Sequence, residues 1–214
     1  MKGKLLAIAL TSMLAGCSNG HLDNYTLNEV HTDSQIIGIP ILLGGHGSSV
    51  PLTENLSLTA SHVAKVDFSN VVAYHPSCDL AIIEKDNKGK KIAKIGKIHQ
   101  GEKVYTIGKG LPLPTHELIG EGTYKQDLSF PSNGYYKDCP ASLVSAAVQV
   151  GMSGGGAYNE NMELVGILSA MVDGVTLIET GEEIPDSTII VPLLFAEEWI
   201  EKVVEEYEGK NKLD

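Results

Sequence analysis

Short apolar runs separated by turn-forming residues are the feature of this sequence that most limits its fold. Gly, Pro, Asn or Asp residues stand between consecutive runs, and each run has the length of a β-strand. This spacing is typical of all-β sandwiches and barrels, and it lacks the long helices that alternate with strands in α/β proteins. The runs cover residues 35–43, 56–60, 71–74, 80–84, 103–107, 117–125, 144–150, 164–170, 175–178 and 188–193. We therefore predict an all-β fold.

The last part of the chain changes its period. Apolar residues recur there at spacings of three and four, and glutamates stand between them, as on an amphipathic helix. The apolar positions are Leu194, Phe195, Trp199, Ile200, Val203 and Val204, and the acidic ones are Glu197, Glu198, Glu201, Glu205 and Glu206. We expect a helix at the C-terminus.

Residues 151–156 read Gly-Met-Ser-Gly-Gly-Gly. Glycines allow a positive φ and a close approach of the backbone to a substrate, so Ser153 is a candidate nucleophile on a tight turn. The backbone N–H groups of Gly151 and Ser153 are candidates to bind a developing oxyanion. A plain Gly-Ser loop is the alternative for the motif taken alone.

Two upstream residues complete a set of catalytic groups. His62 follows the strand-like run at residues 56–60, and Asp79 opens another apolar run. Serine acyl transfer needs a hydroxyl, an imidazole base and a carboxylate that orients the imidazole. Asp67 and Asp86 are the rivals of Asp79 for the carboxylate. Histidine, then aspartate, then serine is the chain order of chymotrypsin-type enzymes, a template known from that family.

With these motifs in this order, the chain resembles the trypsin-like (chymotrypsin-fold) serine peptidases, in the compact bacterial style of the HtrA-like and glutamyl-endopeptidase-like branches. The matching segments are residues 59–62, 79–83, 101–108, 151–155, 165–169 and 189–193. They cover roughly residues 35–205 in the order of the family. The resemblance implies two six-stranded-type antiparallel β-barrels with a C-terminal α-helix, and a serine endopeptidase without metal or cofactor.

The resemblance also implies a substrate pocket. It places Ala147 near the floor of the primary pocket, and an apolar floor argues against selection of Arg or Lys. Ser169 and Met171 lie on a strand that an extended peptide could pair with. Met152 stands where animal trypsins have the aspartate that pairs with a new N-terminus, so no such activation bridge is expected. The alternative function is that of a catalytically inactive homologue that acts as an envelope binding module.

The N-terminus resembles a bacterial lipoprotein signal. Lys2 and Lys4 precede an apolar run at residues 5–14, which is too short to span a bilayer as a mature helix and fits a secretory signal. Residues 14–17 read Leu-Ala-Gly-Cys, which predicts removal of residues 1–16 and lipidation of Cys17. We therefore expect a lipid-anchored protein of the bacterial envelope, on the outer membrane facing the periplasm in a Gram-negative host. An ordinary signal peptide with an incidental cysteine is the alternative.

These segments divide the chain. Residues 17–34 are polar and predict a flexible tether, residues 35–208 the peptidase domain, and residues 209–214 a polar tail. Removal of residues 1–16 takes away two lysines and no acid, which changes the net charge from −11 to −13. Nucleic-acid binding needs clustered positive charge, so we expect a protein or peptide substrate and no nucleic acid. The sequence leaves the oligomeric state open.

Two cysteines remain beside Cys17. An exported chain permits a disulfide between Cys78 and Cys139, and two unbridged thiols are the alternative. His75 and Cys78 alone are too few ligands for a structural zinc site, so no metal is expected.

Overall fold

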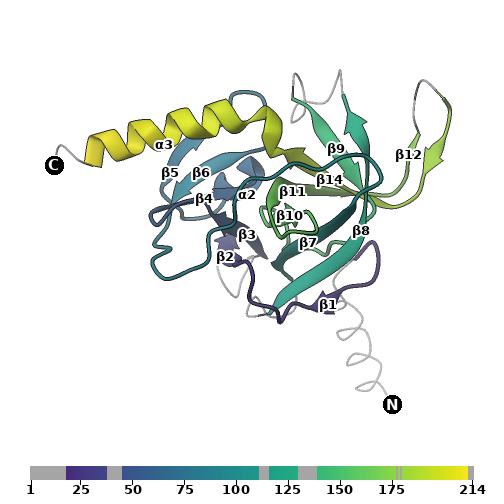
Figure 1. The fold of residues 1–214 in the computed structure, drawn as a ribbon, viewed down its shortest axis with the longest axis horizontal. Helices are drawn as coiled ribbons and strands as arrows, with labels where there is room; N and C mark the ends of the chain where they lie inside the picture. Colours follow the sequence, from purple (N-terminus) through teal and green to yellow (C-terminus); the bar gives the residue numbers. More distant parts are fainter. Residues whose placement is uncertain are drawn as a thin grey trace, which may run out of the picture.

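The computed structural model describes residues 18–37, 45–110, 116–129, 139–176, 178 and 180–211. Two antiparallel sheets stand side by side, and a C-terminal helix extends across the first of them (Figure 1). An all-β fold with a terminal helix is thereby confirmed.

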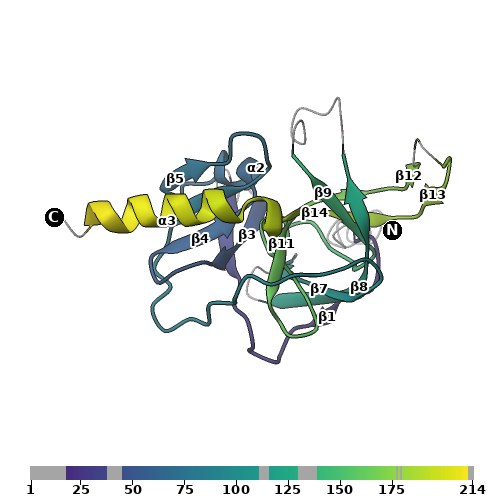
Figure 2. The same cartoon turned by 45° about the horizontal axis from the view of Figure 1, so that its top comes forward.

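The second half of the chain forms a closed barrel. Its strands are β7 (Lys103–Lys109), β8 (Glu117–Leu128), β9 (Ala141–Val144), β10 (Gly156–Tyr158), β11 (Leu164–Val172) and β14 (Ser187–Pro192). They run in the order β8-β7-β10-β11-β14-β9, and a further pairing of β8 with β9 closes the ring. Closure leaves no free sheet edge among these strands. A small hairpin, β12 (Val175–Thr176) and β13 (Glu183–Ile184), projects from it (Figure 2).

The first half forms a five-stranded sheet. Its strands are β2 (Asp33–Ile37), β3 (Gly45–Pro51), β4 (Leu56–Thr59), β5 (Val71–Tyr74) and β6 (Ala81–Glu84). Their order is β2-β3-β4-β6-β5, with five strands described where the resemblance implied six. The short helix α2 (Ser61–Ala64) follows β4 directly. Fully buried leucines and isoleucines, such as Leu58, Leu80 and Ile82, form the core beneath this sheet.

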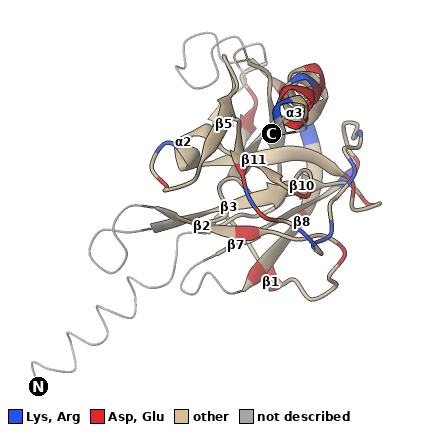
Figure 3. Ribbon diagram, turned by 90° about the vertical axis from the view of Figure 1, so that its left-hand side faces the viewer, with Lys and Arg blue, Asp and Glu red and all other residues tan. Residues whose placement is uncertain are grey.

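The C-terminal helix α3 (Glu197–Asn211) packs its apolar face against the first sheet and leaves its charged residues outside (Figure 3). Trp199 contacts the ring of His75 edge-on at 4.9 Å. Leu194 and Phe195 precede this helix in a 3-10 turn, η1 (Leu193–Phe195), and are half exposed, so they are not part of its buried face as expected. The helix also includes residues 209–211, which the sequence analysis assigned to a polar tail.

The structure corrects the prediction of a flexible tether. Residues 18–34 lie against the barrel, where β1 (Asp23–Asn24) pairs with β8. Tyr25 and Val30 are buried, and the Tyr25 hydroxyl accepts hydrogen bonds from two backbone amides of the segment. Tyr25 and Val30 are too far apart in the sequence to form an apolar period, yet their burial holds this segment on the barrel. The predicted signal segment and Cys17 lie outside the described residues, and within the described part no helix is long and apolar enough to cross a membrane.

Candidate active site

His62 and Asp79 form the centre of the site. His62 lies in α2, just after β4, and Asp79 precedes β6, so the pairing of β4 with β6 brings the two together. The His62 ring Nδ1 donates to Asp79 Oδ2 at 2.8 Å, and the His62 backbone N–H donates to Asp79 Oδ1 at 2.9 Å. Both carboxylate oxygens are therefore used to orient one residue, and Nε2 is left as the ring nitrogen that can accept a proton.

The carboxylate of Asp79 is held ionised. Burial alone would raise the pKa of Asp79, but hydrogen bonds from His62 and Ser169 outweigh it, and the pKa lies below its ordinary value of 3.8. Its side chain is only 2% exposed. The two alternative carboxylates lie elsewhere. Asp67 accepts a hydrogen bond from Ser69, and Asp86 lies on the surface and accepts one from the Lys88 amide.

Ser153 lies on the loop between β9 and β10, and it lines the same cavity as His62. Its hydroxyl donates to the Ser169 carbonyl oxygen at 3.4 Å. Among the described residues, no hydrogen bond joins Ser153 to His62. Ser153 and His62 of the predicted triad thus line one cavity, Asp79 is buried behind His62, and the serine hydroxyl is turned toward β11.

Ser169 has a contact that the sequence analysis missed. It was predicted to bind substrate, and it does line the cavity, but its hydroxyl also donates to Asp79 Oδ2. Ser169 lies at an irregularity of β11, where the pairing with β14 shifts between Leu168 and Ala170. The irregularity allows this side chain to point at a carboxylate from the other sheet.

The turn before Ser153 presents two free amides. Met152 N–H donates to the Gln149 carbonyl at 3.0 Å. Of the two residues between them, Gly151 has a φ of +99°, and the φ of Val150 is not in the left-handed region. This is the pattern of a type II turn. Within the described part of the chain, the N–H groups of Gly151 and Ser153 donate to no protein acceptor.

Ser48 of β3 holds this turn in place. Its N–H donates to the Ser153 carbonyl at 2.7 Å, and its hydroxyl donates to the Gly151 carbonyl at 2.9 Å. The Lys109 amide donates to the same hydroxyl at 2.8 Å. Ser48 is fully buried, so these bonds are shielded from water. These bonds to the carbonyls of Gly151 and Ser153 fix the backbone of the two residues whose amides are candidates to bind an oxyanion.

His46, two residues earlier, packs on the turn. Its Nε2 donates to the Lys109 carbonyl at 3.2 Å, and a Cβ on Gly151 would collide with the ring. Burial lowers the pKa of His46 below 6.5, although hydrogen bonds to the carbonyls of Lys109 and Gly110 act against this. Sequence reasoning missed both residues because β3 reads Gly-His-Gly-Ser-Ser-Val-Pro, without apolar alternation.

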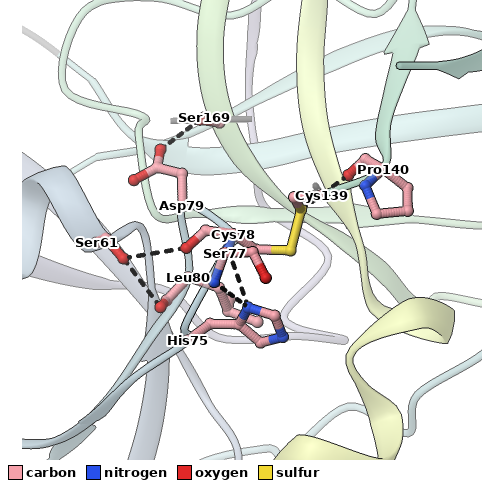
Figure 4. The surroundings of a disulfide bond; sticks show 9 residues. All are labelled: Ser61, His75, Ser77, Cys78, Asp79, Leu80, Cys139, Pro140 and Ser169. Carbon is pink, nitrogen blue, oxygen red and sulfur yellow. Dashed lines mark hydrogen bonds between the residues drawn. A yellow bond between two sulfur atoms is a disulfide. The ribbon is translucent and has the colours of Figure 1, made fainter. Parts of the chain in front are cut away.

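A disulfide joins Cys78 and Cys139, next to the Asp79 carboxylate (Figure 4). It ties the loop before β6 to the segment before β9, and so links the two sheets. His75 Nδ1 accepts from the amides of Ser77 and Cys78, at 3.2 and 2.9 Å, which fixes the shape of the same loop. Burial lowers the pKa of His75, so the ring is neutral and Nδ1 is free to accept.

The fold itself is decided by comparison with solved structures. The HtrA-type protease AlgW with tripeptide matches with a TM-score of 0.66 and 19% identity, over 83% of this chain and 61% of that chain. The active form of the Rv3671c protease from M. tuberculosis matches with a TM-score of 0.63 and 16% identity, over 82% of each chain. The serine endoprotease from Yersinia pestis gives a TM-score of 0.60 at 18% identity, over 83% of this chain and 64% of that chain. The chain has the chymotrypsin-like fold of the trypsin-like serine proteases.

At sequence identities of 16–19%, the similarity to these structures is a similarity of fold. This chain spans about three fifths of the length of the HtrA-type proteases it matches. A scan of protein families and a search of curated proteins find no match to the sequence.

The cavity of this chymotrypsin-like fold has a volume of about 190 Å³ and lies between the two sheets. Val148, Ala170, Met171 and Thr188 contribute to its wall, beside Ser153. Ala147 is not among the lining residues, which corrects the predicted floor by one position. The Ala147 carbonyl accepts from the Thr106 hydroxyl and the Ala147 Cβ lies close to Gly20, while Val148 lines the cavity. No carboxylate lines the cavity among the described residues.

Proposed function

We propose that the protein is a serine endopeptidase that hydrolyses peptide bonds through His62, Asp79 and Ser153. One observation carries the proposal: Ser153 and His62, whose ring is hydrogen-bonded to the buried Asp79, line one cavity, beside two backbone amides that have no protein acceptor among the described residues. That arrangement supplies a base, a nucleophile and an oxyanion site within one volume.

The first step moves one proton. The Ser153 hydroxyl leaves the Ser169 carbonyl by rotation about χ1, and His62 Nε2 takes its proton as the oxygen attacks the substrate carbonyl. Asp79 keeps Nδ1 protonated and stabilises the imidazolium. His62 then gives the proton to the leaving amine, and water repeats the sequence on the acyl-enzyme, releasing the acid and restoring the Ser153 hydroxyl.

The amides of Gly151 and Ser153 bind the oxyanion in this proposal. Each such donor contributes roughly 10²–10³ in rate. Ser48 supports them because it bonds the carbonyl oxygens of Gly151 and Ser153, the same two residues whose amides would bind the oxyanion.

The cavity wall favours an uncharged side chain at the residue before the cleaved bond. Val148 and Met171 offer apolar surface, Thr188 offers one hydroxyl, and the described lining has no carboxylate for Arg or Lys. The cavity of about 190 Å³ suits a small or medium side chain.

A fluorophosphonate probe tests the nucleophile. The full-length protein should be labelled, Ser153→Ala should lose the label, and Ser145→Ala should keep it, because Ser145 is an exposed serine bonded to Thr123. Persistent labelling of Ser153→Ala would refute the assignment. Digestion of a peptide library by the unlabelled wild-type protein then reads out the preference for the residue before the cleaved bond.

The inactive binding module remains the second candidate, since Ser153 bonds Ser169 rather than His62 in the structure. An unlabelled but folded wild-type protein supports that function. Labelling of the wild type that stops in Ser153→Ala excludes it.

The envelope anchor is part of the proposal. Cys17 carries the lipid, and the protein faces the periplasm from the outer membrane in a Gram-negative host. Cys17→Ser should move the protein from the membrane fraction to the soluble fraction and remove the mass of the acyl chains. Unchanged membrane association would defeat the anchor and leave the peptidase proposal intact.

A further inference from the structure

The first described residues of the chain pair with the wall of the cavity. Ser18 forms an antiparallel bridge with Gln149, and the Asn19 N–H donates to the Val148 carbonyl at 3.2 Å. Gly20 lies so close to Ala147 that a Cβ on it would stand 3.0 Å from the Ala147 Cβ. Residues 18–20 therefore act as a short extra strand beside residues 147–149.

The side chain of Asn19 adds two bonds to this pairing. Its Oδ1 accepts from the Val148 N–H at 2.7 Å, and its Nδ2 donates to the Thr188 hydroxyl at 3.2 Å. Thr188 in turn donates to the Ala146 carbonyl at 2.8 Å. The donors and acceptors alternate along this chain, so each polar group has one consistent role. Asn19 thus connects the two cavity-lining residues Val148 and Thr188, which come from different segments of the barrel.

This stretch of the barrel packs into the core through Ala146 and Val148 but has few backbone hydrogen bonds. The chain leaves β9 at Val144, and within the described residues the only backbone–backbone hydrogen bond of residues 146–148 is the one between Val148 and Asn19. Both backbone polar groups of Val148 are satisfied by Asn19. The next residue, Gln149, begins the type II turn that presents the Gly151 amide. The support that Asn19 provides therefore lies directly upstream of the candidate oxyanion site.

We propose that Asn19 is a positioning residue of the substrate pocket, which sets the place of Val148 and the turn that follows it. The proposal rests on the peptidase function proposed above. It means that the segment that follows Cys17 is a part of the pocket. Loss of the Asn19 side chain should leave the Val148 amide without its acceptor and the Thr188 hydroxyl without the donor from Asn19, and the wall should shift relative to Ser153.

The test compares full-length Asn19→Ala with the wild type, each purified from membranes in detergent. Two lost hydrogen bonds at the wall predict a fall in kcat/KM of roughly 5- to 30-fold and a changed preference for the residue before the cleaved bond. A role in stability alone would change neither the preference nor the ratio of kcat to KM in the folded protein. Asn24→Ala is the matched control, because Asn24 lies exposed in β1 of the same segment.

Asn19→Asp serves as the second variant. It keeps the acceptor for the Val148 amide and removes only the donor to Thr188, so it retains part of the support if Asn19→Ala does not fold. The substrate preference should shift in either of the two variants that has the unfolding temperature of the wild type. If such a variant keeps the substrate preference and the kcat/KM of the wild type, the proposal for Asn19 is overturned. If the wild type itself is inactive, the proposed peptidase function fails instead.

Discussion

The hydroxyl of Ser169 donates a hydrogen bond to the carboxylate of Asp79, across the boundary between the two sheets. Ser169→Ala leaves this buried carboxylate with one donor fewer, and a hydrogen bond to a charged group contributes about 1.5–3 kcal/mol. We expect kcat/KM to fall about 10-fold or more, and the pKa of Asp79 to rise toward its ordinary value. Steady-state kinetics on a peptide substrate measures the effect.

Ser142→Ala is the control for this prediction. Ser142 is also a buried serine that donates to a carboxylate, Asp127, at 2.6 Å, but it lies away from the cavity. It should lower the unfolding temperature and leave kcat/KM unchanged. Equal loss of activity in both variants would contradict a specific role for Ser169.

Gly151→Ala should remove most of the activity. A side chain there is strained by the φ of +99° and collides with the ring of His46, so the turn must change shape and the candidate oxyanion amide must move. Loss of one such donor predicts a fall in kcat of roughly 10²–10³. Gly101→Ala is the control, because Gly101 has a φ of +87° but open space around it. It should lose stability only, and an active Gly151→Ala enzyme would show that this amide is not needed.

His75 makes the stability of the loop before Asp79 dependent on pH. Burial lowers its pKa below 6.5, so the unfolded chain takes up a proton at a higher pH than the folded one. The contribution of His75 to stability is therefore complete above about pH 6.5 and is lost as the pH falls from there toward the folded pKa. His75→Asn keeps an acceptor for the amides of Ser77 and Cys78 but does not titrate.

We expect His75→Asn to flatten the decline of the unfolding temperature below about pH 6.5. Thermal unfolding of the wild type and of His75→Asn at a series of pH values measures this difference. Parallel curves for wild type and His75→Asn would assign the pH dependence to other groups.

The disulfide predicts sensitivity to reduction. Cys78 and Cys139 are 61 positions apart, and a bridge over a loop of that length stabilises by about 4 kcal/mol in the chain-entropy account. The double variant Cys78→Ala and Cys139→Ala should unfold at a lower temperature and should no longer respond to reductant. Since Asp79 follows Cys78 directly, activity should also fall. A wild-type protein that is indifferent to reductant would contradict a stabilising bridge.

The residues of the candidate site could be predicted where a short sequence motif surrounds them. His62, Asp79 and Ser153 stand beside short motifs, and their order along the chain is informative without any structure. Contacts between distant segments leave no such motif. Ser48, His46 and Asn19 belong to polar or glycine-rich stretches, and they gain partners only when β3 meets Lys109 and the turn before Ser153 and when residues 18–20 dock.

The fold was predictable at the level of its class and less so in its boundaries. The apolar run at 71–74 coincides with β5, but the run at 144–150 is a strand only at its first residue, because Val148 there pairs with Asn19 instead of a barrel strand. β3 carries the buried serines Ser48 and Ser49, whose burial depends on hydrogen bonds from other segments. Apolar periodicity cannot detect such a strand.

If Cys17 bears the lipid, the pairing of Ser18 with Gln149 limits the distance between the cavity and the membrane surface. One residue separates the anchor from the cavity wall, and a residue spans at most about 3.6 Å. The pocket then stays within a few residues' length of the bilayer surface. Polypeptide segments that lie close to the membrane, such as the regions beside membrane anchors of other envelope proteins, are in reach, and those held far above it are not.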